Sequence, residues 1–469
     1  MSIFQTKAIA NLVEETQGKQ GLKKALGALD LTLLGIGAII GTGIFVLTGV
    51  AAANYSGPAL VISFILSGLA CGFAALCYAE FASMVPVAGS AYTYGYAALG
   101  EFWAWIIGWD LILEYGLAVA TVAIGWSGYA VNLLGNLGVH LPKALTLAPM
   151  DGGIVNLPAI LIIALVAWLL YSGVQQTSRL NGIIVAIKVA VVLLFVVLAV
   201  GHVKPVNWHP FMPFGFKGVL SGAAVIFFAY IGFDAVSTAA EETRRPQKDV
   251  PRGILFSLLI CTVLYIIVSA ILTGVVKFSI FGRPEAASAP VAYALQQIGI
   301  HWGAALVSVG AICGITSVLV VMAYGQTRVL FAMSRDGLLP KIFSKVSERR
   351  KTPATSTVLV AIVTAVTAGF LPINIVAEMT NIGTLAAFVI VCVAVIVLRY
   401  KRPDLERPFK APLVPVLPAL GAICCTILIA SLQPATLIRF AVWFAIGMVI
   451  YFGYSIRHSE LQQGAKKTA

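Results

Sequence analysis

The residues best placed for chemistry lie in two apolar stretches that glycine interrupts near the middle. The first stretch covers residues 31–45 and carries Gly-Thr-Gly at 41–43, and the second covers 225–234 and carries Gly232. A helix broken inside hydrocarbon leaves backbone groups unpaired, which is tolerated only beside a cavity or a ligand. Two such breaks, one in each half of a membrane protein, indicate the central binding site of a transporter.

The backbone groups at these breaks suit a zwitterion. A half-helix that begins inside the membrane presents free amides and a positive dipole end, which suit a carboxylate. A half-helix that ends there presents free carbonyls, which suit an ammonium group. The predicted site comprises Ile39, Ile40, Gly41, Thr42 and Gly43 at the first break and Phe228, Ala229, Ile231 and Gly232 at the second. This set predicts binding of an α-amino acid; the alternative is that the glycines are packing contacts between helices.

The composition indicates a chain solvated mainly by lipid. Of its 469 residues, 59% are hydrophobic and 11% are charged, whereas a soluble domain carries about 25% charged residues. Apolar runs of about 20 residues, each long enough to cross the bilayer, recur along the whole length. We predict an all-α membrane protein with twelve spans, near 31–55, 58–83, 99–132, 154–174, 181–202, 217–240, 252–276, 303–328, 355–371, 379–398, 412–432 and 435–456.

The positive charges divide unevenly between the two sides of the predicted bundle. Of the 31 Lys and Arg residues, Lys188 falls inside a span and 24 fall in the two tails and the loops on the same side as the tails. The opposite side holds the other six, namely Lys143, Lys204, Lys217, Lys277, Arg283 and Arg439. This asymmetry predicts a multi-pass protein of the cell membrane with both termini in the cytoplasm. The net charge of +12 therefore indicates topology and attraction to membrane lipids, and not nucleic-acid binding.

The spans group into two sets of five. The first set covers 31–202 and the second covers 217–398, and each opens with a glycine-broken helix. Because five is odd, the second set must enter the membrane in the opposite orientation, which predicts an inverted repeat. The remaining segments are a peripheral pair of spans at 412–456 and cytoplasmic tails at 1–30 and 457–469.

Ionisable residues inside the membrane are costly and mark candidate functional groups. Lys188 has no partner nearby in sequence and lies roughly 10 Å inside span five, so it is a candidate for binding and releasing a proton; the alternative is a snorkelling lysine. Glu114 shares a helix face with Asp110 and is a candidate proton relay, an attraction for a basic substrate, or a protonated packing carboxyl. Glu80, near the cytoplasmic surface, is expected to form an ion pair or part of a gate.

Five strings are similar to those of a known transporter family. They are GIGAIIGTGIFVLTG at 35–49, YAEFASMVPVAGSAYTY at 78–94, GWDLILEY at 108–115, IGFDAVSTAAEETRRPQKDVP at 231–251 and RVLFAMSRDGL at 328–338. With them the chain resembles the amino acid–polyamine–organocation superfamily, and within it the cationic amino acid transporter family. Animal members often carry fourteen spans, so a chain with twelve spans resembles a bacterial member. For a bacterial member, small neutral amino acids are an alternative to cationic substrates.

The resemblance implies a leucine-transporter fold, a 5+5 inverted repeat with discontinuous helices 1 and 6. It implies a site between spans one, three, six and eight, with backbone ligands at Ile39, Thr42, Gly43, Phe228, Ala229 and Ile231. It also implies that Lys188 takes the place of a sodium ion beside carbonyls near Gly37 and Ile40. Asp234 matches a carboxylate position linked to gating or proton release.

We therefore predict a secondary transporter that brings free L-amino acids into the cell with protons by alternating access. The alternatives are a facilitator or exchanger of arginine and lysine without proton coupling, and an amino acid sensor that moves no substrate. The sequence carries no enzyme motif and no metal-ligand spacing, so neither catalysis nor a cofactor is expected, and the proton is the expected coupling ion. The preferred side chain, the oligomeric state and any small membrane partner stay open.

Overall fold

A computed structural model describes residues 5–6, 26–84, 90–172, 178–347 and 352–463. This part of the chain folds almost wholly into helices, as predicted. The principal ones are α2 Ala28–Ile39, α3 Thr48–Ala51, α4 Leu60–Met84, α5 Ser90–Ala98, α6 Glu101–Asn136, α7 Leu157–Tyr171, α8 Ser178–Ala199, α9 Gly215–Ile226, α10 Ala235–Thr238, α11 Pro246–Val275, α12 Pro284–Ser288, α13 Pro290–Gln297, α14 His301–Arg335, α15 Ala354–Phe370, α16 Ile373–Lys401, α17 Val416–Ala430, α18 Pro434–Ile450 and α19 Ile456–His458.

Eight helical stretches of the described chain are long and apolar enough to cross a membrane. Four further apolar helices are shorter, namely α2, α7, α15 and α17. The protein is therefore an all-helical, multi-pass membrane protein. Each expected span overlaps at least one helix of the described chain, while the number of crossings, the inverted repeat and the orientation of the termini stay predictions.

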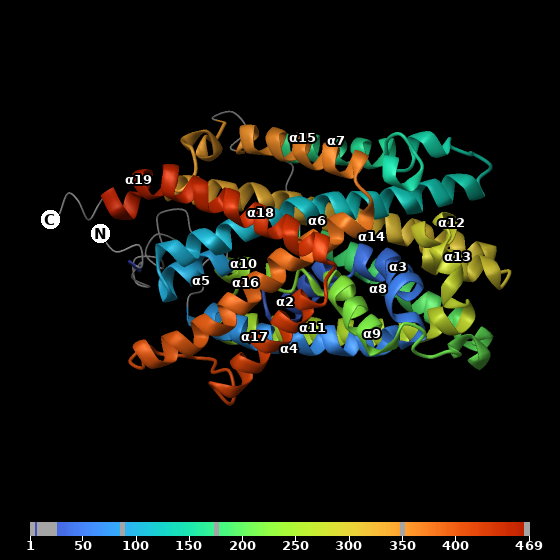
Figure 1. The fold of residues 1–469 in the computed structure, drawn as a ribbon, viewed down its shortest axis with the longest axis horizontal. Helices are drawn as coiled ribbons and strands as arrows, with labels where there is room; N and C mark the ends of the chain where they lie inside the picture. The colour runs from blue at the N-terminus through green and yellow to red at the C-terminus, as the bar shows by residue number, and fades with distance from the viewer. Residues whose placement is uncertain (1–4, 7–25, 85–89, 173–177, 348–351, 464–469) are drawn as a thin grey trace.

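The long helices run along the long axis of the molecule (Figure 1). Helices α5 and α19 lie at one end and α12 and α13 at the other (Figure 1). The end with α5 also carries the last turns of α14, because Tyr92 of α5 hydrogen-bonds to Asp336. It carries the end of α16 too, because Leu398 and Lys401 line one hollow together with Ala98 of α5. The basic segments that follow α14 and α16 therefore gather at one end, which we call the basic end.

Among the helix boundaries that differ from the expected spans, two have identifiable reasons. The third span is preceded by the separate helix α5, because Gly100 adopts φ +99° and turns the chain before α6 begins. Helix α16 begins at Ile373, six residues before the expected 379. The helix can include the charged Glu378 because hydrogen-bond donors inside the protein pair with its carboxylate. Its carboxylate accepts hydrogen bonds from Tyr55 at 2.9 Å and from Thr436 at 2.6 Å.

Candidate functional site

The first break separates α2 from the π-turn Gly43–Leu47. Ile40 has extended backbone (φ −72°, ψ 105°), and its amide closes the last hydrogen bond of α2 at 2.9 Å. Across the described residues, no backbone carbonyl accepts a hydrogen bond from the amides of Gly41, Thr42 or Gly43. The predicted break is confirmed, and it presents amide donors at the start of the second half-helix.

The second break follows α9. The chain passes through the 3₁₀ turn Phe227–Tyr230 into extended backbone at Ile231 (φ −60°, ψ 135°). Gly232 then adopts φ +115°, a left-handed conformation that strains any residue with a side chain. Helix resumes only at Ala235, so this predicted break is also confirmed.

The two breaks lie against each other. A Cβ atom on Gly43 would overlap the Cα and nitrogen of Ala229, and one on Gly232 would lie 2.8 Å from the carbonyl oxygen of Ala38. Only glycine permits backbones to approach so closely. The structure thus brings together the two sets of residues that the sequence predicts as one site.

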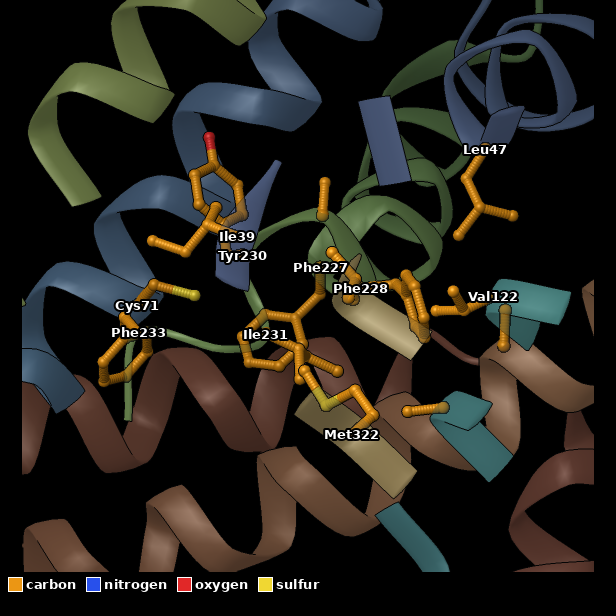
Figure 2. Packing of buried hydrophobic residues seen from close by; sticks show 14 of the residues in the cluster. Ile39, Leu47, Cys71, Val122, Phe227, Phe228, Tyr230, Ile231, Phe233 and Met322 are labelled. Atoms are coloured by element: carbon orange, nitrogen blue, oxygen red, sulfur yellow. The ribbon is translucent and has the colours of Figure 1, made fainter. Parts of the chain in front are cut away.

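The surroundings of the breaks are apolar. Helix α14 contributes Val318, whose Cγ2 would lie 3.1 Å from a Cβ atom on Gly41. Figure 2 shows Phe228, Ile231, Val122 and Met322 in one buried cluster beside the breaks. These side chains can enclose an apolar group, and they offer no charge to a cationic one.

One polar side chain at the first break is buried and unused. Among the described residues, the Thr42 hydroxyl has no hydrogen-bond partner. It packs against Gly125 of α6, where an added Cβ atom would lie 2.9 Å from that hydroxyl oxygen. A buried polar group without a partner is costly, so Thr42 is a candidate donor to a bound substrate.

Other helices supply donors to carbonyls that the breaks release. The Tyr265 hydroxyl donates to the carbonyl of Ile39 at 3.0 Å. The Asn381 amide donates to the carbonyls of Ala224 at 2.8 Å and Val225 at 2.7 Å. Sequence reasoning missed both residues; the available signal was a polar side chain within an otherwise apolar span.

Lys188 is 0% exposed, which contradicts the alternative of a snorkelling side chain. Its ammonium donates a hydrogen bond to the carbonyl of Gly37 in α2. Helix α14 makes room for the aliphatic stem, since a Cβ atom on Gly314 would lie 2.8 Å from Cγ of Lys188. The side chain therefore connects α8 to α2 just before the first break.

Three buried carboxyl groups lie along α6 and at the second break. The Tyr115 hydroxyl donates to Asp234 at 3.1 Å, and Thr384 of α16 lies beside Glu114. Within the described chain, neither carboxyl oxygen of Asp110 has a hydrogen-bond partner. The structure thus places Glu114 and Asp234 near each other, as a proton relay would require.

Glu80 forms a buried ion pair at the basic end, as predicted. Arg399 donates to its two carboxylate oxygens, each at 2.8 Å, and Arg407 approaches to 3.4 Å. The backbone amide of Ala411 donates a further hydrogen bond at 2.8 Å. These contacts attach α4 to the end of α16 and to the loop that follows it.

The breaks and their contacts lie inside the region that a family model covers. A model described as amino acid permease matches residues 26–455. The chain belongs to the amino acid permease family. This finding confirms the resemblance to the amino acid–polyamine–organocation superfamily.

Several relatives match this permease over nearly its whole length. It is 55% identical over 466 residues to "Branched-chain amino acid permease BcaP" of Bacillus subtilis (strain 168), covering 98% of this chain and 99% of the relative. It is 50% identical over 464 residues to "Methylthioribose transporter" of the same organism, covering 98% and 100%. "Cationic amino acid transporter 4, vacuolar" of Arabidopsis thaliana is 39% identical over 399 residues, covering 83% of this chain and 66% of the relative.

The permease therefore transports substrates, as its family does, and is not expected to catalyse a reaction. The structure places Gly43 against Ala229 and Gly232 against Ala38, and it sets Lys188 beside α2. We propose below which of these groups bind the substrate and which bind a proton.

Proposed function

We propose that the permease carries zwitterionic L-amino acids with apolar, branched side chains by alternating access. The observation that carries the proposal is the close approach of the two breaks, with Gly43 against the backbone of Ala229 and Gly232 against the carbonyl of Ala38. Amides at the first segment suit the substrate carboxylate, and carbonyls at both suit its ammonium group. The proposed ligands are Ile39, Ile40, Gly41, Thr42, Gly43, Phe228, Ala229, Ile231 and Gly232.

An apolar substrate side chain fits the surroundings better than a cationic one. Val318, Phe228 and Met322 offer only apolar contact, and an unpaired charge buried against them would be strongly disfavoured. Two relatives named as branched-chain amino acid permeases, 55% and 40% identical, support this choice. A cationic substrate would instead require Glu114 or Asp234 to reach its side chain.

Proton coupling is the second part of the proposal. A charged Lys188 holds the carbonyl of Gly37 and so favours one position of α2 relative to α8. Loss of its proton to water weakens that hydrogen bond and frees α2 to move. Glu114 and Asp234 are proposed to pass the proton toward the basic end, which faces the cytoplasm in the proposed leucine-transporter arrangement of twelve spans.

A second candidate function has its own observation. The relative named as a methylthioribose transporter is 50% identical and as fully covered as the first. Methylthioribose carries neither a carboxylate nor an ammonium group. It would therefore offer no charged partner to the backbone amides and carbonyls at the breaks. Uptake of leucine, arginine and methylthioribose into proteoliposomes, with and without a proton gradient, separates these functions and also excludes or reveals a sensor that moves nothing.

Thr42 permits a focused test of the site. In the variant Thr42→Val the shape is kept and the hydroxyl is lost, and we expect leucine affinity to fall about tenfold or more, because a hydrogen bond to a charged group is lost. Thr48→Val is the matched control, since the buried Thr48 hydroxyl already donates a hydrogen bond to the carbonyl of Ile44, one turn earlier in the chain, at 2.7 Å. Equal leucine affinity in the two variants would count against a carboxylate at the first break.

A further inference from the structure

A large hollow lies at the basic end of the permease, between the end of α5, the start of α6 and the second half of α16. Its volume is about 970 Å³. Much of its lining is apolar and includes Leu99, Trp103, Val393 and Val397. Val393 is 42% exposed on a helix apolar enough to span the membrane. The hollow therefore opens on a surface that lipid can reach.

Two basic side chains, Lys401 and Arg402, also line the hollow where α16 ends. Within the described residues, Lys401 forms no ion pair, while Arg402 pairs with the exposed Asp404 at 2.9 Å. Of the nearby acids, Glu101 is buried and accepts hydrogen bonds from Tyr96 and Ser459. Its carboxylate therefore faces the protein, so it does not neutralise Lys401, whose positive charge has no ion-pair partner in the part of the chain that the structure describes.

Glu80, the other buried acid of this end, is likewise occupied, because it is paired with Arg399. An apolar hollow with two basic groups at one end, of which Lys401 has no ion pair among the described residues, matches the chemistry of an anionic phospholipid. Basic pockets between membrane helices attract anionic head groups, and aliphatic side chains favour an acyl chain by burial of apolar surface. Trp103 is suited to the boundary between these zones, since aromatic residues favour the level of the head groups.

We propose that this hollow binds an anionic phospholipid, with its phosphate at Lys401 and Arg402 and an acyl chain along Trp103, Val393 and Val397. A zwitterionic phospholipid would fill the apolar part equally well. It would gain less at the basic end, because its head group carries a compensating positive charge. The site is distinct from the substrate site at the breaks and does not depend on which substrate is carried.

Native mass spectrometry of the purified permease tests the proposal. The protein is titrated with phosphatidylglycerol and with phosphatidylethanolamine of the same acyl chains. We expect the wild type to prefer phosphatidylglycerol. The double variant Lys401→Gln/Arg402→Gln should lose about 25-fold in phosphatidylglycerol affinity, about fivefold for each charge. Its phosphatidylethanolamine affinity should change little.

The matched control removes one Lys and one Arg elsewhere at the same end. Lys345→Gln/Arg457→Gln alters two exposed residues that do not line the hollow, and we expect wild-type lipid affinity. A third variant, Val397→Trp, fills the apolar part and should weaken binding of both lipids.

Two results would overturn the proposal. One is equal affinity of the wild type for the two lipids. The other is an equal loss of phosphatidylglycerol in the control and the hollow variants. If the double variant does not elute as a single folded species, Lys401→Gln alone is used, because this exposed side chain has no ion pair to lose among the described residues. Its phosphatidylglycerol affinity should fall about fivefold.

Discussion

Lys188 of α8 donates a hydrogen bond to the carbonyl of Gly37 in α2, two residues before that helix ends at Ile39. The lysine is wholly buried, so a change in its charge would act directly on the neighbouring helices. This contact connects the proposed proton site to the proposed substrate site through a single turn of helix. Each part of that connection can be altered separately.

Replacement of Lys188 by methionine keeps the length of the side chain and removes its charge. We expect Lys188→Met to abolish leucine accumulation driven by a proton gradient, because the variant lacks the proposed proton-binding group that holds α2. Exchange of labelled for unlabelled leucine should continue, since the breaks are intact. Lys341→Met, at an exposed lysine of the basic end, is the control. Full proton-driven accumulation by Lys188→Met would remove the coupling role.

Gly43 is expected to tolerate no side chain. The variant Gly43→Ala adds a methyl group that would overlap the backbone of Ala229, and overpacking of this kind costs about 1–3 kcal/mol. We expect leucine affinity to fall about tenfold or more in a scintillation proximity assay. Gly72→Ala is the control, because a Cβ atom there meets nothing within 4 Å. Wild-type affinity in Gly43→Ala would contradict the close approach of the two breaks.

Asn381 is expected to position the second break. Asn381→Leu removes two hydrogen bonds to the carbonyls of Ala224 and Val225, at a cost of about 1–3 kcal/mol for each group left unpaired. We expect a lower melting temperature and a raised KM for leucine uptake.

Asn207→Leu is a close control for Asn381→Leu. Asn207 donates in the same way to the carbonyls of Gly274 and Val275, at 2.8 and 3.2 Å, at the end of α11. Both variants should lose stability, and only Asn381→Leu should raise KM. Equal effects on KM would mean that Asn381 has only a general role in stability.

The ion pair of Glu80 is expected to stabilise the basic end. Glu80→Gln leaves Arg399 and the buried Arg407 without their carboxylate, and breaking a buried pair costs about 3–5 kcal/mol. Melting in detergent should therefore occur at a clearly lower temperature. Asp404→Asn breaks an exposed pair in the same loop and should change the melting temperature little, as surface pairs do. Equal melting of the two variants would refute this role.

Much of the candidate site could be predicted because its determinants are local. Glycine within an apolar run indicates a broken helix, and a lone lysine within another run indicates a buried functional group. The partners of these groups could not be predicted. The contact of Asn381 with Ala224 joins residues 157 positions apart, and no single-sequence pattern specifies how α16 packs on α9.

The helix boundaries show the same division. The positive φ of Gly100 separates α5 from α6. Glycine permits this conformation but does not enforce it, so the sequence alone could not predict the turn. The early start of α16 depends on Tyr55 and Thr436, which satisfy Glu378 from distant segments. The hollow at the basic end is lined by residues of three helices together with Thr6 and Leu405, so it could be found only from the structure.

The central claim is that the backbone at the breaks binds the two charged groups of an amino acid. The most direct test compares the affinity of the purified permease for leucine with that for two analogues, 3-methylbutylamine, which lacks the carboxylate, and 4-methylpentanoate, which lacks the ammonium group. The account predicts that each analogue binds about 100-fold more weakly or worse, because each leaves several backbone groups unpaired. Binding of either analogue as tight as that of leucine would contradict it.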